Sequence, residues 1–132
     1  MPARLLLRIP HVITPHVRGF TATGAFHYAF LFDQDLSLRQ VARDIGRHNA
    51  VDKAIEQQLL ARGRLEDSFL YLTGRITQQV VAKCVRAGLP LAASPGAALA
   101  GAVALARERG LGLVGFLRGG RFNVYSRPDL IG

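Results

Sequence analysis

The stretch SFLYLTGRITQQVVAKCVRAG, residues 68–88, decides the fold that this sequence predicts. Its first part, SFLYLT, is a short run of apolar and aromatic residues, which is typical of a buried strand. Gly74 breaks that run, residues 76–87 have the periodicity of a helix, and Gly88 ends the helix. A strand, a turn and a helix in succession form the repeating unit of an α/β protein.

The same alternation continues on both sides of this stretch. Upstream, residues 24–33 predict a buried strand, residues 36–41 a shorter one, and residues 50–60 a helix whose inner stripe is Val51, Ile55 and Leu59. Downstream we expect a strand at 91–93, a helix at 97–109, a strand at 113–117 and an edge strand at 121–126. The sequence therefore predicts a three-layer α/β domain over residues 1–132, with a largely parallel sheet flanked by helices.

Composition narrows the class of protein. No apolar run approaches the roughly 20 residues that a membrane span needs, and residues 1–10 do not resemble a signal peptide. We expect a soluble, cytoplasmic protein. The single cysteine, Cys84, excludes an internal disulfide and the paired-cysteine zinc sites. It falls on the apolar face of its predicted helix, where burial would raise the pKa of the thiol, so we interpret it as core filler.

The charge balance indicates an anionic ligand or partner. The formal net charge is +8, and 15 of the 17 basic residues are arginine, the better bidentate binder of phosphate and carboxylate. The arginines are spread along the chain and do not cluster as in a typical nucleic-acid patch. A bias of base composition toward arginine codons explains the charge equally well.

The stretch RDIGRHNAVDK, residues 43–53, is the densest group of polar side chains. Helical geometry places Asn49, Asp52 and Lys53 on the outer face of the helix and turns His48 inward at its first turn. In a parallel α/β sheet this is where strand ends and helix beginnings converge, and the free N–H groups there favour anions.

Three further residues belong to this turn. Arg47 would look into the crevice together with His48, and Gly46 would give the backbone an unusual turn or a close approach to a ligand. Asp44 would cap the helix or orient the donors. The alternative is a core histidine held by one hydrogen bond beside a capped helix start.

Two later turns repeat the arrangement. Thr73-Gly74-Arg75 and Ser94-Pro95-Gly96 each join a predicted strand to a predicted helix, and on their own they are also explained by a solvated arginine and a plain turn. His27 lies inside the first predicted strand, where a buried histidine with a hydrogen-bond partner is the simpler interpretation. Three such turns on one edge of a sheet indicate a site more strongly than any one alone.

Four motifs in order resemble the formate dehydrogenase accessory sulfurtransferase family, FdhD. FTATGAFH resembles the family's F-x-x-TGG-x-H, DIGRHNAVDK its DVGRHNAVDK, TGRIT its SGRxS, and LVGFLRGGRFNVYS its closing LvGF-R-x-x-r-fNVY. The resemblance covers residues 20–126 and leaves residues 1–19 as a divergent N-terminal segment.

The resemblance implies a cytidine-deaminase-like fold without that fold's zinc. Family members take sulfur from a cysteine desulfurase and pass it to the molybdenum cofactor of formate dehydrogenase, bis-molybdopterin guanine dinucleotide, which they bind through its guanine nucleotide portions. The motifs carry over as cofactor-binding residues, and none as catalytic or metal-binding residues: His27, Asp44, Gly46, Arg47, His48, Asn49, Asp52, Lys53, Gly74 and Arg75.

The departures concern sulfur transfer more than binding. The family carries sulfur on a Cys-x-x-Cys loop upstream of the TGG motif, and we expect this chain to lack that carrier and to be inactive alone as a sulfurtransferase. Single family positions differ as well, including Arg43 for a glutamate, Ala25 for the second TGG glycine, Thr73 for a serine and Gln79 for a glutamate. The family's S-A-P-T turn is also absent from SPGAALAG.

Three functional hypotheses follow. The first is an FdhD-like protein of cofactor maturation, with formate dehydrogenase and a cysteine desulfurase as partners. The second is a guanine-nucleotide-binding or regulatory module without sulfurtransferase activity. The third and weakest is RNA binding driven by charge, for which association must weaken as salt rises. The sequence leaves open whether the domain forms a homodimer.

Overall fold

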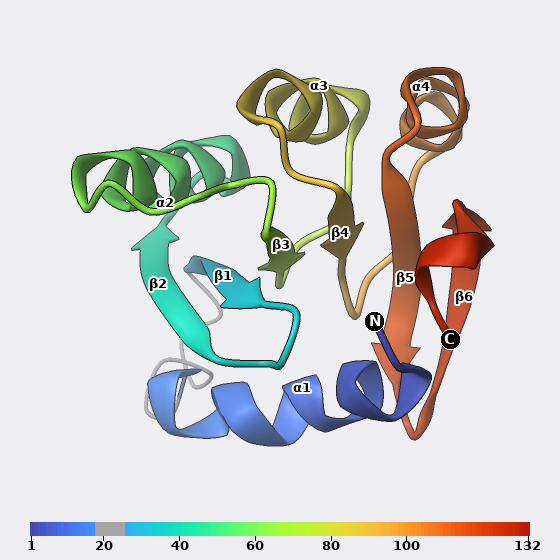
Figure 1. The fold of residues 1–132 in the computed structure, drawn as a ribbon, viewed down its shortest axis with the longest axis horizontal. Coiled ribbons are helices and arrows are strands. Elements are labelled where there is room, and N and C mark those ends of the chain that lie inside the picture. Colours follow the sequence, from blue (N-terminus) through green and yellow to red (C-terminus); the bar gives the residue numbers. More distant parts are fainter. Residues whose placement is uncertain (18–25) are drawn as a thin grey trace.

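The computed structural model describes residues 1–17 and 26–132, and in them it has one six-stranded sheet with helices on both faces (Figure 1). Residues 18–25, which hold Phe20 and Ala25 of the first family motif, lie outside the described residues. The elements in chain order are α1 (Ala3–Val17), β1 (His27–Asp33), β2 (Leu38–Asp44), α2 (Arg47–Leu60), β3 (Ser68–Leu72), α3 (Gln78–Ala87), β4 (Leu91–Ala93), α4 (Ala100–Arg109), β5 (Gly112–Arg118), β6 (Arg121–Ser126) and the short 3₁₀ helix η1 (Pro128–Leu130). The prediction of a layered α/β domain is confirmed.

The prediction of a largely parallel sheet is wrong. The strand order is β2-β1-β3-β4-β5-β6, and of the five pairings only β3 with β4 and β4 with β5 are parallel. Short turns cause this, because strands joined by a hairpin run antiparallel. Gly119 and Gly120, at φ of 62° and 76°, form such a turn between β5 and β6. The prediction of β6 as an edge strand is confirmed.

The direction of β2 matters for the site. Both β2 and β3 are antiparallel to β1, which lies between them, so these two strands point the same way and α2 crosses over β1 to join them. The strands β2, β3, β4 and β5 consequently end on the same side of the sheet. We call the turns that follow these four strands the carboxyl edge.

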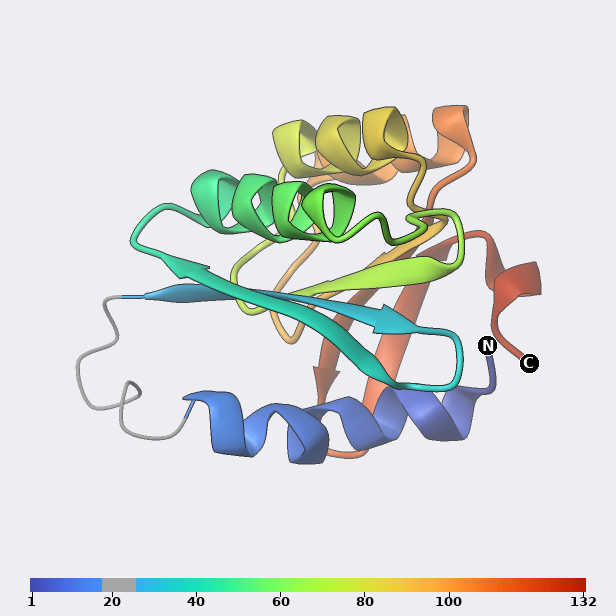
Figure 2. The ribbon, with the colours of Figure 1, turned by 60° about the vertical axis from the view of Figure 1, so that its left-hand side comes forward.

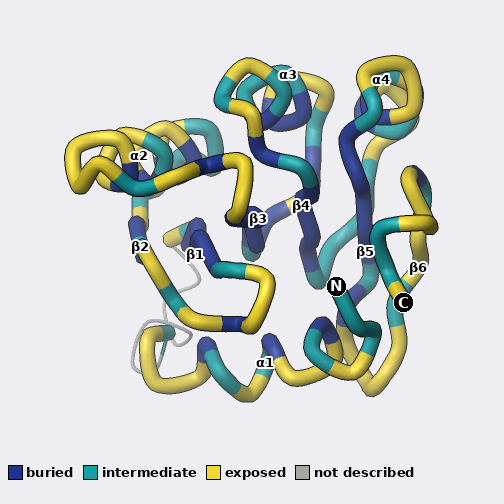
Figure 3. Tube along the Cα trace, in the orientation of Figure 1, coloured by how far each residue is buried: buried dark blue, intermediate teal, exposed yellow. Residues whose placement is uncertain are grey.

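The face of the sheet under α2, α3 and α4 packs small and aliphatic side chains. Val51, Val80 and Cys84 reach down from the helices onto Leu70 and Leu72 of β3, and all five are fully buried. Figure 3 shows the buried residues concentrated in the sheet and on the inner sides of these helices. Removing such side chains from water supplies most of the driving force for folding.

The inner stripe of α2 differs from the prediction at one position. Val51 is buried and Ile55 is partly buried, as expected, but Leu59 is 58% exposed and Gln58 is 4% exposed. The helix also begins at Arg47, three residues before the predicted start. Gln58 takes the inward position because its side-chain oxygen accepts a hydrogen bond of 3.0 Å from Gln40 Nε2 on β2.

The opposite face of the sheet is covered by α1, which the sequence did not indicate (Figure 2). Leu6, Ile9 and Ile13 recur with helical spacing and are buried against aromatic side chains of the sheet. The helix contains Pro10 and Pro15, which predict a break. Packing of the apolar stripe on the sheet outweighs that cost, because tertiary burial contributes more to the stability of a protein helix than local propensity does. The relation to cytidine deaminases stays a prediction.

Candidate functional site

The turn between β2 and α2 is held by Asp44. Its Oδ1 accepts a hydrogen bond of 2.9 Å from the Gly46 backbone N–H and one of 3.4 Å from Asn49 Nδ2, and its Oδ2 lies 2.6 Å from Lys53 Nζ. The hydrogen bonds from Lys53 and from Gly46 lower the pKa of Asp44 to about 2. Asp44 therefore orients this turn, as expected, and Asn49 and Lys53 serve the same carboxylate.

Gly46 does not take an unusual conformation. It precedes the helix with φ −93° and ψ 127°, an extended conformation open to any residue, and no side chain caps the helix there. Of the two alternatives predicted for each residue, the structure excludes the unusual turn at Gly46 and the capping role of Asp44. The close approach of a ligand to Gly46 stays a prediction.

The His48 side chain is half-buried, and one of its two ring nitrogens points inward. Its Nδ1 is buried and has no hydrogen-bond partner among the residues that the structure describes. The inward orientation is confirmed for this atom, and the alternative of a core histidine held through it is not supported. A buried polar atom without a partner is costly and often marks a functional position.

Asp52 does not join the group around Asp44. Both of its carboxylate oxygens lie 2.9 Å from Lys83 Nζ, which belongs to α3. The pair bridges α2 and α3 in the helical layer. Asp52 thus stabilises the packing of helices and is the one predicted site residue whose side chain is engaged away from the carboxyl edge.

The closest grouping at the edge joins His27, Arg47 and Gly74, which come from β1, α2 and the turn after β3. A Cβ atom placed on Gly74 would lie 2.8 Å from His27 Nδ1 and 3.6 Å from Arg47 Nε. Burial, and next the Arg47 guanidinium, lower the pKa of His27 below its ordinary value, so the imidazole is mostly neutral at pH 7. The prediction that separate turns converge here is confirmed.

Hydrogen bonds of the Ser94 hydroxyl and of the backbone join the second and third turns. Ser94 Oγ donates to the Gly74 carbonyl at 2.7 Å and accepts from the Gly96 N–H at 2.9 Å. The Ile76 N–H donates to the Ala97 carbonyl at 3.0 Å. Arg75 is exposed at this junction, and a Cβ on Gly96 would lie 3.5 Å from its backbone nitrogen.

The structure adds a part of the edge that the prediction did not assign to the site. A hollow of about 560 Å³ lies at the hairpin between β5 and β6, lined by Phe116, Arg118, Gly119, Arg121, Phe122 and Asn123. It adjoins the third turn, because the Phe116 N–H donates to the Gly96 carbonyl at 2.9 Å. The Arg118 guanidinium lies 5.3 Å from the centre of the Phe116 ring. The arginines and aromatic residues of the closing motif were the available signal.

The carboxyl edge is cationic. Among the described residues, Arg47, Arg75, Arg118 and Arg121 form no ion pair, whereas the carboxylate of Asp44 is neutralised by Lys53. The helices α2, α3 and α4, which follow β2, β3 and β4, also begin at this edge with their first N–H groups. The arrangement suits a ligand with phosphate groups, since arginine binds phosphate bidentately.

Neither a metal cluster nor a membrane span is found in the part of the chain that is described. Residues 1–17 and 26–132 contain no group of three or more His, Cys, Asp or Glu side chains able to hold a metal ion. No described helix is both long enough and apolar enough to cross a membrane. Cys84 is fully buried, and burial raises its pKa to about 12.

Comparison with known proteins gives consistent matches. The FdhD/NarQ family matches residues 1–132. The chain is 41% identical over 134 residues to the sulfur carrier protein FdhD of Mycolicibacterium paratuberculosis, covering 98% of this chain and 48% of that protein. It is 43% identical over 128 residues to the protein of the same name from Streptomyces coelicolor, covering 96% and 45%.

A solved structure agrees with these matches. A crystal structure described as that of a formate dehydrogenase accessory protein from Desulfotalea psychrophila has a TM-score of 0.89 and 32% identity, covering 100% of this chain and 56% of that one. The chain spans about half the length of the curated relatives it matches. The family match over residues 1–132 and the shared fold together show that this chain belongs to the FdhD/NarQ family.

Proposed function

We propose that this chain forms the cofactor-binding part of a formate dehydrogenase accessory protein. In this proposal the carboxyl edge binds the guanine nucleotide portions of bis-molybdopterin guanine dinucleotide. Relatives that are 41% and 43% identical to this chain are named sulfur carrier protein FdhD, and a similar solved structure is described as a formate dehydrogenase accessory protein. The proposal thus joins the family's named role to the residues of this edge.

The single observation that carries the proposal is the close contact of His27 with Gly74. A Cβ atom on Gly74 would lie 2.8 Å from His27 Nδ1 and 3.6 Å from Arg47 Nε, so glycine is what lets these two side chains approach the same turn. His48 Nδ1 and the arginines Arg47 and Arg75 lie on elements of the same edge, and within residues 1–17 and 26–132 the Nδ1 has no hydrogen-bond partner and these arginines have no acidic one. A nucleotide diphosphate supplies the anionic and hydrogen-bonding groups that such an edge lacks.

The predicted residues would divide into three roles. Arg47 and Arg75 would bind phosphate oxygens, and His27 and His48 would hydrogen-bond with polar groups of the ligand. Gly46 and Gly74 would let backbone and ligand approach. Asp44, Asn49 and Lys53 would keep the turn in place, while Asp52 would act only through α2 and α3. When bound, the cofactor would supply the molybdenum centre of a formate dehydrogenase.

Sulfur transfer, in this proposal, uses residues outside this chain. A sulfur carrier needs an exposed thiol of low pKa, because the thiolate is the nucleophile. Cys84 is fully buried and its pKa is raised, which is the opposite environment. The proposed partners are a cysteine desulfurase as sulfur donor and a formate dehydrogenase as recipient of the cofactor.

Calorimetry with GDP and ADP tests the binding part of the proposal. We expect GDP to bind about tenfold more tightly than ADP. The Arg75→Ala substitution should weaken the binding of GDP by about tenfold, the equivalent of roughly 1.4 kcal/mol. Arg86→Ala is the matched control, since Arg86 is an exposed arginine on α3 with no ion pair among the described residues. Absence of binding to either nucleotide would remove the proposal.

The burial of Cys84 also favours a second candidate, a guanine-nucleotide-binding regulatory module without a role in sulfur chemistry. Both candidates predict GDP binding at the carboxyl edge. They differ in their partner, because only the accessory role requires association with a formate dehydrogenase. Co-purification of this chain with the dehydrogenase of its own organism, lost in Arg75→Ala, would select the accessory role.

A further inference from the structure

A second pocket lies at the other end of α2, about 20 Å along the helix from Arg47. Its volume is about 400 Å³, within the range of small-molecule sites. It is formed by the end of β1, the start of β2, the end of α2 and the loop before β3, and its lining residues are Asp33, Arg39, Gln40, Gln58, Ala61, Gly63, Arg64 and Asp67. We call it the Gln58 pocket.

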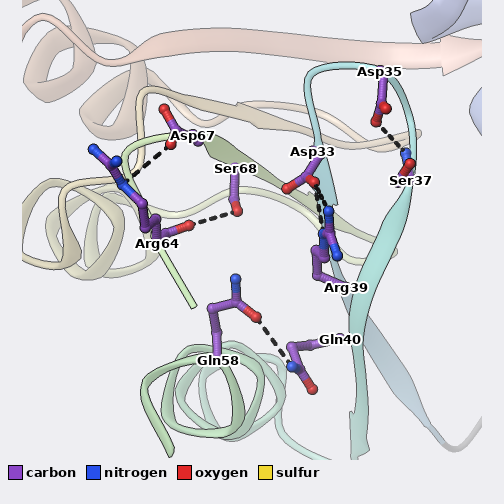
Figure 4. A network of polar contacts seen from close by, with 9 residues as sticks. All are labelled: Asp33, Asp35, Ser37, Arg39, Gln40, Gln58, Arg64, Asp67 and Ser68. Carbon is purple, nitrogen blue, oxygen red and sulfur yellow. Dashed lines mark hydrogen bonds and ion pairs between the residues drawn. The ribbon is translucent and has the colours of Figure 1, made fainter. Parts of the chain in front are cut away.

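Gln58 gives this pocket a buried polar group with unused hydrogen-bonding capacity. The residue is 4% exposed, and its Oε1 accepts a hydrogen bond from Gln40 Nε2 (Figure 4). Its Nε2 donates to no acceptor among the described residues. Because this nitrogen has no acceptor among the described residues and Gln58 lines the pocket, its N–H groups are available to a ligand acceptor.

Gly63 keeps that amide in place. A Cβ atom on Gly63 would lie 2.2 Å from Gln58 Nε2, so any larger residue would push the amide out of its position. The Gly63 N–H also donates to the Gln58 carbonyl at 2.8 Å, which fixes the loop against the helix end. The position of the Gln58 amide donor is therefore fixed by the Gly63 loop.

The charges of the pocket balance, unlike those of the carboxyl edge. Figure 4 shows Arg39 paired with Asp33, and Arg64 Nε lies 3.2 Å from Asp67 Oδ2. The lining carries two arginines and two aspartates, whose formal charges cancel, and Arg64 also pairs with Glu66 at 2.8 Å. An anion alone would face two carboxylates and a cation alone two guanidinium groups, whereas a ligand with both charges offers an opposite charge to each partner of the existing ion pairs.

We propose that the Gln58 pocket binds a free α-amino acid. Its carboxylate accepts from Gln58 Nε2 and shares the guanidinium groups of Arg39 and Arg64, and its ammonium group donates to Asp33 and Asp67. Charge-assisted hydrogen bonds at both ends give such a zwitterion an advantage over a neutral amide. The proposal is independent of the function proposed for the carboxyl edge.

The test follows the side-chain amide signal of Gln58 by nuclear magnetic resonance of the isotope-labelled full chain. Glycine, L-serine and L-glutamine are the probes, and glycine betaine is the matched control because it keeps both charges but has no N–H. We expect a saturable shift with at least one amino acid at millimolar concentration, and binding of betaine weaker by about tenfold. No saturable shift with any amino acid, or equal binding of betaine, would overturn the proposal.

Two variants locate the binding. Gln58→Leu and Gly63→Ala should each abolish the binding of the amino acid, measured by calorimetry, with the fold checked by circular dichroism. Arg75→Ala, at the carboxyl edge, should leave it unchanged. Binding that persists in a folded Gln58→Leu chain would also overturn the proposal, and Gly63→Ala, which retains the glutamine, covers the case in which Gln58→Leu does not fold.

Discussion

The carboxyl edge and the interior of the sheet are formed by neighbouring residues of the same strands. The interior residues contact other buried side chains, whereas the residues of the edge are polar and partly exposed. Within β1, Ala29, Phe30 and Leu31 are fully buried, while His27 at the start of the strand is half-buried beside Gly74 and Arg47. The interior is fully buried, whereas the edge is charged and holds the His48 Nδ1 atom, which has no hydrogen-bond partner among the described residues. Stability is therefore expected to depend on the interior and ligand binding on the edge.

The largest effect on stability is expected from Phe30→Ala. The Phe30 ring is fully buried and lies 6.0 Å from the His16 ring and 6.2 Å from the Tyr71 ring. Its removal should lower the free energy of unfolding by about 3–5 kcal/mol, measured by urea denaturation. Leu60→Ala, at a position 77% exposed, is the control and should change it by less than about 0.5 kcal/mol. A folded Phe30→Ala chain with weakened GDP binding would contradict the division.

The second prediction concerns the edge, where a substitution should affect ligand binding more than stability. Gly74→Ala places a Cβ 2.8 Å from His27 Nδ1, so the imidazole must move away from this turn. GDP binding, measured by calorimetry, should weaken by about tenfold or more. Gly96→Ala is the matched control, since its Cβ would meet its nearest neighbour at 3.5 Å, an ordinary contact. Equal loss in both variants would show that the edge responds to any added methyl group.

The third prediction concerns Cys84, whose thiol belongs to the interior and should therefore be protected from reagents and have no part in ligand binding. Its thiol should resist alkylation in the native chain at pH 8, because burial raises its pKa to about 12, and react readily after unfolding. Cys84→Ala should cost about 1 kcal/mol of stability by urea denaturation and leave GDP binding unchanged. Rapid alkylation of the native protein would show that the thiol is accessible.

Pattern alone predicted the segments that form the strands and the helices α2, α3 and α4, but not how the strands pair. Apolar runs such as residues 68–72 report burial, and burial does not distinguish a parallel from an antiparallel neighbour. The helix α1 was missed because Pro10 and Pro15 predict a break, and only its packing on the sheet stabilises it. In α2, Gln58 replaced Leu59 as the inward residue because of its partner Gln40, which is distant in the sequence.

For the site as well, the sequence predicted the local features and missed the contacts between residues distant in the chain. The three turns that carry Arg47, Gly74 and Gly96 do lie on one edge, because the end of each strand and the start of each helix are local features. The side-chain partners are not local. Helical geometry placed Asp52 on the outer face of the helix and the family resemblance gave it a cofactor-binding role, but its carboxylate pairs with Lys83 on another helix, and no pattern within residues 43–53 shows that contact.

The smallest expected effect is a change in the pH dependence of stability through Asp44→Asn. The pKa of Asp44 is about 2 in the folded chain and about 3.9 in an unfolded one, so the unfolded state binds the proton more readily. The stabilisation by this carboxylate is complete above about pH 4 and is lost as the pH falls through the folded value. Asp44→Asn removes the charge at every pH, and the decline in urea midpoint between about pH 4 and 2 should become less steep.

Asp129→Asn is the matched comparison for that measurement. The hydrogen bond from Arg127 lowers the pKa of Asp129 as well, but this pair lies in η1, away from the carboxyl edge. Both variants should flatten the acid limb of stability, because both carboxylates are ionised and paired in the folded chain. Only Asp44→Asn should also weaken GDP binding at pH 7, since Asp44 alone fixes the Gly46 turn and thereby the position of Arg47. Loss of GDP binding in both variants would show that binding follows the net charge of the chain and not the geometry of the edge.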